Sequence, residues 1–166
     1  MNAVLEAWNN ADESSAKEAM LACCGARRWA EQMVALRPIP SIAELSEAAD
    51  RVWADMSGAD WMEAFARHPR IGERKASEKS TAWSTQEQAG TSSAANHVMR
   101  ELAEGNGQYE ERFGFTYIVC ASGKSADEML TILQRRLANE PVAELKEAAE
   151  QQRQILQIRL GKWLLS

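Results

Sequence analysis

The stretch SIAELSEAADRVWADM, residues 41–56, indicates the fold class more clearly than any other part of the chain. Its apolar residues recur at steps of three and four from Leu45 to Met56, as they do on one face of an amphipathic α-helix. Ser41 and Glu44 have the spacing of a capping box, in which each side chain bonds to the backbone N–H of the other residue. The pattern predicts a capped helix with one buried face.

Signals of the same kind continue on both sides of this stretch, so the chain is expected to be almost entirely helical. Further helices are predicted at residues 12–24, 26–36, 60–68, 84–103, 125–138 and from 141 to the C-terminus. Gly58 and Gly105 are expected to end the helices that precede them. Asp60 is expected to cap the helix that ends at His68, and residues 69–83 are predicted to form a surface loop.

The stretch FGFTYIVCASG, residues 113–123, does not look helical, because it is rich in aromatic and β-branched residues and is bounded by glycines. The sequence offers no partner strand for it. We therefore expect an extended segment threaded through a helical core, whose buried backbone groups bond to side chains or to a ligand. The predicted fold is an all-α, single-domain helical bundle of residues 1–166 with one extended buried segment near residues 113–122.

Composition narrows the classes of partner and the compartment. The 166 residues suit one domain, and 45% apolar with 26% charged residues is typical of a globular protein. The net charge of -5 argues against a nucleic-acid or membrane partner. The chain has three cysteines, two of them adjacent, and neither an N-terminal signal pattern nor an apolar run of membrane-spanning length. A reduced, cytoplasmic protein is expected.

Three residues suggest chemistry. His68 stands before Pro69, at a predicted helix end, and Glu87 lies three residues after Ser84, in the first turn of the next helix. Arg159 falls within the apolar arc of the last helix, where a guanidinium needs an anionic partner. Each also fits a structural role: a helix-terminal histidine, a capping box and a buried ion pair. Spacing alone leaves these alternatives open.

Metal and nucleophile signatures are weak. With two histidines and no HExxH or CxxC spacing, no metal site is predicted. Cys120 has apolar neighbours, which raise the pKa of a thiol, so a core or pocket-lining role is favoured over a nucleophilic one.

A set of short motifs nonetheless resembles one enzyme family, the 2-oxo-4-hydroxy-4-carboxy-5-ureidoimidazoline (OHCU) decarboxylases of urate breakdown, which yield (S)-allantoin. The similar pieces, in chain order, are Cys23-Cys24, Trp29, Arg37-Pro38, Trp61 to Phe65, His68-Pro69-Arg70-Ile71-Gly72, Trp83-Ser84, Glu87-Gln88-Ala89-Gly90, Asn106, Tyr109, Phe113-Gly114-Phe115 and Arg159-Leu160. They span nearly the whole chain, and they are specific as a set.

The resemblance implies an all-α bundle, usually a homodimer, that acts on a small ureidoimidazoline without a cofactor. It places the catalytic histidine and glutamate on His68 and Glu87. It also places substrate contacts on Pro69, Ser84, Gln88, Tyr117, Ile118, Val119, Cys120, Ala121 and Arg159. One OHCU decarboxylase-like domain is then expected over residues 1–166.

The residue types fit this chemistry independently of the family resemblance. Arg159 offers a cation, Gln88 an amide, and Ile118, Val119 and Ala121 an apolar wall, while His68 with Glu87 can move a proton. Two other hypotheses stay open. The first is a cofactor-free ureide hydrolase, in which the same pair activates water. The second is a non-catalytic helical interaction domain whose tryptophans line a binding groove.

Overall fold

The computed structural model describes residues 1–71 and 93–166, except for the side chains of residues 93 and 94. The described residues form eight α-helices and no strand, so the predicted all-α class is confirmed. The chain divides into two compact units, one of residues 1–67 with 149–166 and the other of residues 68–148. That the chain forms one domain stays a prediction.

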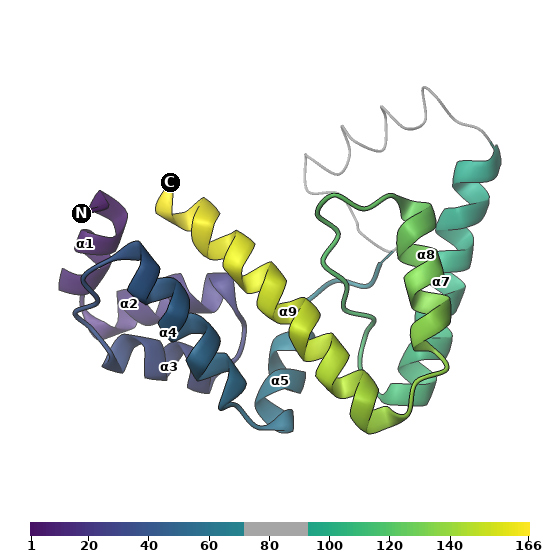
Figure 1. The fold of residues 1–166 in the computed structure, drawn as a ribbon, viewed down its shortest axis with the longest axis horizontal. Helices are drawn as coiled ribbons and strands as arrows, with labels where there is room; N and C mark the ends of the chain where they lie inside the picture. The colour runs from purple at the N-terminus through teal and green to yellow at the C-terminus, as the bar shows by residue number, and fades with distance from the viewer. Residues whose placement is uncertain (72–92) are drawn as a thin grey trace. The chain divides into compact units, whose positions relative to one another are not determined.

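The first unit contains α1 (Ala3–Asn10), α2 (Glu13–Cys23), α3 (Arg27–Ala35), α4 (Ile42–Ala54), α5 (Gly58–Phe65) and the later part of α9 (Pro141–Leu164) (Figure 1). Its two ends meet, because the Asn2 side chain donates to the carbonyl of Leu164 at 3.0 Å. The rings of Trp8 and Trp163 also pack edge to face, with centroids 6.1 Å apart.

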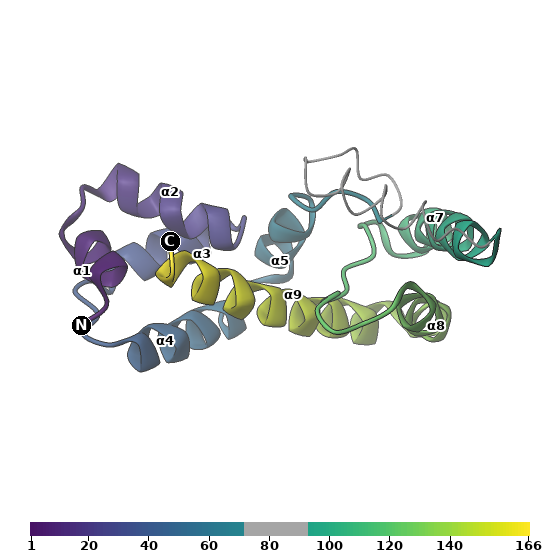
Figure 2. The ribbon, with the colours of Figure 1, turned by 90° about the horizontal axis from the view of Figure 1, so that it is seen from above.

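Buried tryptophans join pairs of helices in this unit, since each indole N–H donates to a backbone carbonyl of another helix. The pairs are Trp8 with Ala16, Trp29 with Ala49 and Trp53 with Ala149, at 3.0, 3.1 and 3.0 Å. They link α1 to α2, α3 to α4, and α4 to α9. Figure 2 shows α4 and α9 running side by side. Each bond lets a large apolar ring be buried while its polar atom is satisfied.

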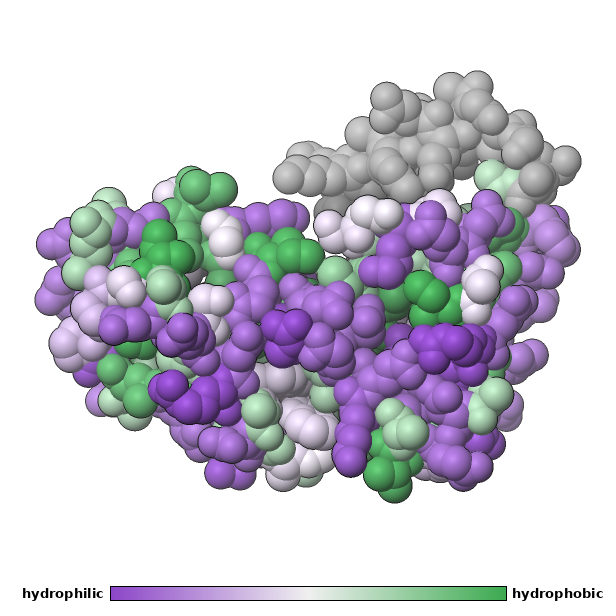
Figure 3. Space-filling view, viewed as in Figure 1, coloured by the Kyte–Doolittle hydropathy of each residue, from purple (hydrophilic) through white to green (hydrophobic). Residues whose placement is uncertain are grey.

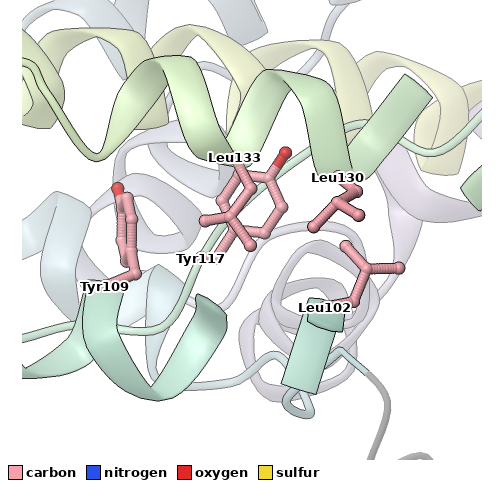
Figure 4. Close-up of a cluster of buried hydrophobic side chains, with 5 residues drawn as sticks. All are labelled: Leu102, Tyr109, Tyr117, Leu130 and Leu133. Atoms are coloured by element: carbon pink, nitrogen blue, oxygen red, sulfur yellow. The ribbon is translucent and has the colours of Figure 1, made fainter. Parts of the chain in front are cut away.

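The second unit contains α7 (Ser93–Phe113), α8 (Ala126–Arg136) and the start of α9. The helices α7 and α8 lie side by side (Figure 1). Between them is a set of buried side chains, the core cluster: Leu102, Tyr109, Tyr117, Leu130 and Leu133. Figure 4 shows Tyr117, from the stretch between the helices, lying among side chains from α7 and α8.

Most of the predicted helix starts are confirmed. Asp12, Ser41 and Ser125 each accept a hydrogen bond from a backbone N–H in the first turn of α2, α4 and α8. The helix α9 begins at Pro141, as its fixed φ favours. The short helix α1, which the sequence reading did not predict, is capped by Asn2 in the same way.

The predicted boundaries of α5 are wrong. Its N-cap is Ser57, and Ser57 and Asp60 form a reciprocal capping box, with N–H to side-chain oxygen distances of 3.1 and 3.2 Å. Gly58 therefore opens this helix instead of closing the one before it. The helix also ends at Phe65, so His68 follows the helix end by three residues.

The predicted stop at Gly105 is wrong too, because α7 continues unbroken to Phe113 and ends before Gly114, whose φ is +83°. Gly105 lies where α7 faces Leu133 of α8. A Cβ built there would lie 2.6 Å from Cδ2 of Leu133 on α8. The glycine allows α7 and α8 to approach closely.

No helix among residues 1–71 and 93–166 combines the length and apolar character needed to cross a membrane.

Candidate active site

The site residues predicted from the sequence are distributed over both units and the part of the chain outside the described residues. Ser84, Glu87 and Gln88 lie outside the described residues. His68, Pro69 and residues 117–121 belong to the unit of residues 68–148, and Arg159 belongs to the other unit, on α9. Their assignment to a site stays a prediction, but the surroundings of the described ones can be set out.

The stretch around His68 contacts the rest of the second unit through an ion pair and through an apolar side chain. His68 is half-buried and Pro69 is exposed. Arg70 forms an ion pair with Glu110 of α7, with Nη2 and Oε2 2.7 Å apart. Ile71 packs against the core cluster. The position of His68 is therefore restrained by the contacts of Arg70 and Ile71, which follow it in the chain.

Residues 116–121, here called the extended segment, form neither helix nor strand, and they lie within the predicted range of 113–122. The predicted start at Phe113 is wrong, because Phe113 is the last residue of α7. The backbone groups of the extended segment bond to side chains. The N–H of Tyr117 donates to Oδ1 of Asn106 at 2.8 Å, and the carbonyl of Ile118 accepts from Nη1 of Arg136 at 2.6 Å. The carbonyl of Cys120 accepts from Nζ of Lys124 at 2.8 Å. Asn106 and Arg136 thereby replace the neighbouring strand that a sheet would supply.

The side chains of the extended segment differ in exposure. Tyr117, Ile118 and Cys120 are buried, Val119 is half-buried and Ala121 is exposed. Burial raises the pKa of Tyr117 to about 12, so its hydroxyl stays neutral, and it donates to the carbonyl of Met129 at 2.9 Å. Tyr117 therefore contributes a packed ring and a satisfied hydroxyl.

Two of the nominated stretches share one support. Ile71, three residues after His68, and Val119, in the middle of the extended segment, both pack against the core cluster. Stretches that are distant in sequence are therefore fixed by the same group of side chains.

Arg159 is half-buried on α9, between the buried Leu156 and Leu160. Within the described residues, no carboxylate oxygen lies within 4.0 Å of its guanidinium. Its charge acts on the thiols of Cys23 and Cys24. A half-buried cation without a carboxylate is suited to bind an anionic ligand.

The adjacent thiols are poor nucleophiles. Burial raises the pKa of Cys23 to about 11 and that of Cys24 to about 12, and the attraction of Arg159 only partly opposes this. Both groups are therefore protonated near neutral pH. Cys23, Cys24 and Cys120 all carry free, buried thiols.

The second unit also holds a buried polar network that was not predicted from the sequence. It is formed by Arg136, Glu144 and Tyr109, each 0% exposed. A signal was available. Arg136 follows Leu130 and Leu133 at steps of three, so it falls on the apolar face of its helix. Arg136, like Arg159, is therefore a guanidinium on an apolar helix face, where it needs an anionic partner.

Comparison with known proteins decides the family. A family model described as OHCU decarboxylase matches residues 9–161. The chain belongs to the OHCU decarboxylase family. A bifunctional uric acid degradation protein from Arabidopsis thaliana is 38% identical over 152 residues, which are 84% of this chain and 44% of the plant protein. The chain thus spans less than half the length of that relative.

Other members of the OHCU decarboxylase family match over more of their own length. A decarboxylase of this name from Haloferax volcanii is 27% identical over 161 residues, 95% of this chain and 94% of that protein. A crystal structure of an OHCU decarboxylase in the presence of (S)-allantoin is 36% identical, with a TM-score of 0.74, over 94% of this chain and 100% of that one. A structure of (S)-allantoin synthase, 18% identical with a TM-score of 0.71, shows the shared fold.

Proposed function

We propose that this protein converts OHCU to (S)-allantoin and carbon dioxide in urate breakdown. It is a member of the OHCU decarboxylase family, and its relatives carry names from uric acid degradation. The observation that carries the proposal is the common support of two motif stretches, because Ile71 beside His68-Pro69 and Val119 in the extended segment pack on one core cluster.

The proposed roles follow the chemistry of each side chain. His68 manages the proton, and Glu87 orients the histidine and stabilises its charged form. Arg159 binds the substrate's anionic group, which fits a half-buried guanidinium with no carboxylate within 4.0 Å among the described residues.

Further contacts are proposed from the resemblance. Gln88 supplies an amide, and Ser84 and Pro69 are substrate contacts as well. The extended segment provides the remaining contacts through Tyr117, Ile118, Val119, Cys120 and Ala121.

The reaction requires a place for an electron pair. When the bond between the ring carbon and the carboxylate breaks, its electrons can move into the adjacent ring C=N bond. A proton must reach the ring as carbon dioxide leaves. A histidine is well suited to this transfer, since its ordinary pKa is near 6.5. We propose that no cofactor takes part.

A coupled assay tests the proposal. Urate is oxidised and the resulting 5-hydroxyisourate is hydrolysed by added enzymes, then this protein is added and allantoin is followed by circular dichroism. We expect an allantoin signal of one hand whose rate rises with protein concentration, with release of carbon dioxide. Heat-denatured protein is the control. An unchanged rate and no optical activity would refute the proposal.

The same assay separates the hydrolase alternative. A ureide hydrolase would cleave the ureido arm with water, releasing ammonia as well as carbon dioxide, and would form no optically active allantoin. The two reactions therefore differ in ammonia and in allantoin. Measuring both products distinguishes them.

The interaction-domain alternative has less support in the structure. It assigns the tryptophans to a binding groove, whereas the indoles of Trp8, Trp29 and Trp53 are buried and bond within the protein. On the face shown in Figure 3, hydrophobic residues of the described chain form small groups separated by hydrophilic ones. Large interaction surfaces are usually more continuous.

We further propose that the protein is a cytoplasmic homodimer. Its three thiols are free, which fits a reducing compartment. Light scattering after size-exclusion chromatography measures the oligomeric state directly, and a monomer mass at micromolar concentration would contradict the dimer.

A further inference from the structure

The backbone of the extended segment is hydrogen-bonded to a buried charged side chain, that of Arg136. Arg136 and Glu144 are both 0% exposed. Nε and Nη2 of Arg136 donate to Oε2 of Glu144 at 2.9 and 2.5 Å, and the hydroxyl of Tyr109 donates to the same oxygen. The other carboxylate oxygen accepts from Asn139 at 3.0 Å. The pair is therefore fully hydrogen-bonded on its acidic side.

The arginine has two further bonds. Nη2 also donates to the hydroxyl oxygen of Tyr109 at 3.4 Å, and the other bond leads to the extended segment. Nη1 of Arg136 donates to the carbonyl of Ile118 at 2.6 Å. The guanidinium carbon also lies 4.9 Å from the ring centroid of Tyr117 and 5.8 Å from that of Tyr109. Arg136 thus contacts two parts of the extended segment, the carbonyl of Ile118 and the ring of Tyr117.

Stability alone is a poor reason for such a pair. Removing two charges from water is costly, and replacing a buried ion pair by apolar side chains of similar volume is often neutral or stabilising. What an apolar pair cannot do is donate a hydrogen bond to the Ile118 carbonyl. The fork of a guanidinium can hold a carboxylate and a carbonyl at once, in fixed directions.

We propose that Arg136, oriented by Glu144, is a positioning residue that fixes the backbone of the extended segment for substrate binding. The inference rests on the proposed function. Arg136 itself touches no substrate in this account, and it acts through the Ile118 peptide. A displacement of about 1 Å in a substrate-positioning group can lower the rate about 10²-fold.

The test replaces both charges together, as Arg136→Met with Glu144→Leu, so that no unpaired charge is left buried. We expect a folded protein with a helical circular dichroism spectrum. We also expect kcat/KM to fall about 10- to 100-fold, with KM rising more than kcat falls. The pH dependence of kcat should stay as in the wild type, because the proton-transfer groups are elsewhere.

A matched control lies one residue away. Arg135 and Glu147 form an ion pair between the same two helices, with side chains 58% and 29% exposed. This pair has no bond to the extended segment among the described contacts. Arg135→Met with Glu147→Leu should keep kcat/KM within about twofold, since exposed pairs contribute little.

Hydrogen exchange adds a structural readout. Peptides covering residues 116–121 should lose protection in the Arg136→Met, Glu144→Leu variant and keep it in the control. If the double variant does not fold, Arg136→Lys takes its place, because it keeps the charge but lacks the fork. We expect it to raise KM, and a wild-type KM there would overturn the inference.

The outcomes separate the two proposals. An inactive wild type refutes the proposed function and this inference with it. An active wild type together with an equally active Arg136→Met, Glu144→Leu variant refutes the inference alone.

Discussion

At the scale of single residues, His68 is the side chain on which the proposed chemistry depends most. It is half-buried, in a stretch held by Arg70 and Ile71. We expect His68→Asn to lower kcat about 10²- to 10⁴-fold, as for loss of a general acid or base, with little change in melting temperature. The coupled assay and a thermal melt measure the two effects. Near-normal turnover would mean that another group moves the proton.

Glu87 tests whether a capping residue is also catalytic. It lies outside the described residues, so the prediction rests on its spacing from Ser84 and on the family resemblance. Glutamine also fits the third position of a capping box, so Glu87→Gln should cost less than the roughly 0.5–2 kcal/mol of a lost cap. We expect turnover to collapse while the free energy of unfolding hardly changes. Wild-type turnover would leave Glu87 only its capping role.

Arg159 tests the anionic subsite. Lysine keeps the charge and loses the planar fork, so Arg159→Lys should raise KM about tenfold or more, in line with a charge-assisted hydrogen bond of about 1.5–3 kcal/mol. Allantoin should also raise the melting temperature of the Arg159→Lys variant less than it raises that of the wild type. The control is Arg153→Lys on the same helix, whose arginine pairs with Asp50 and Glu150. Equal effects in the two variants would contradict a binding role for Arg159.

At the scale of helices, α7 offers a paired test with two glycines. Gly105 is buried against Leu133, and a Cβ at Gly107 would meet no atom within 4 Å. Both Gly→Ala changes gain about 1 kcal/mol of helix propensity, but only Gly105→Ala crowds the neighbouring helix. We expect Gly105→Ala to be less stable than Gly107→Ala by about 1–3 kcal/mol. Urea denaturation measures the difference, and equal stabilities would mean that Leu133 moves aside freely.

The helices were largely predictable because their signals are local. Caps at Asp12, Ser41 and Ser125, and the proline that opens α9, act within one turn of the residues concerned. The errors came where a distant partner decides. Gly105 resembles a helix stop in the sequence. Its role in packing depends on Leu133, which is distant in sequence and lies on α8.

The candidate site shows the same division. That the extended segment needs side-chain partners follows from the lack of a partner strand, but Asn106 and Arg136 as those partners depend on how α7 and α8 pack. His68 was placed at a helix end on the rule for residues before proline. The actual end at Phe65 reflects a turn that local propensity did not reveal.

At the scale of the whole molecule, buried thiols make stability depend on alkaline pH. The pKa of Cys23 is raised from 9.0 to about 11, and that of Cys24 to about 12. Well below pH 9 both thiols are neutral whether the chain is folded or unfolded, so their contribution to stability is fully present. Above pH 9 the unfolded chain loses protons that the folded one keeps, and stability falls by about 1.4 kcal/mol per thiol and pH unit.

Urea denaturation between pH 8 and 10.5 measures this decline. Tyrosines and lysines also ionise there, so the comparison is with Cys24→Ala, which removes one thiol. We expect a shallower decline in that variant above pH 9. The same slope in both proteins would show that the thiol of Cys24 ionises as easily folded as unfolded.

The bond from Asn2 to Leu164 joins positions 162 apart in sequence. Contacts between residues so far apart in sequence are expected to form later than local ones. The core cluster draws on residues 102 to 133, so its loops are short and close early. The unit of residues 1–67 waits for residues 149–166, and until α9 arrives the indole of Trp53 has no carbonyl from Ala149 to bond. When only α1 to α5 have been synthesised, the core of the first unit is incomplete, and the apolar surface that α9 later covers is expected to favour aggregation.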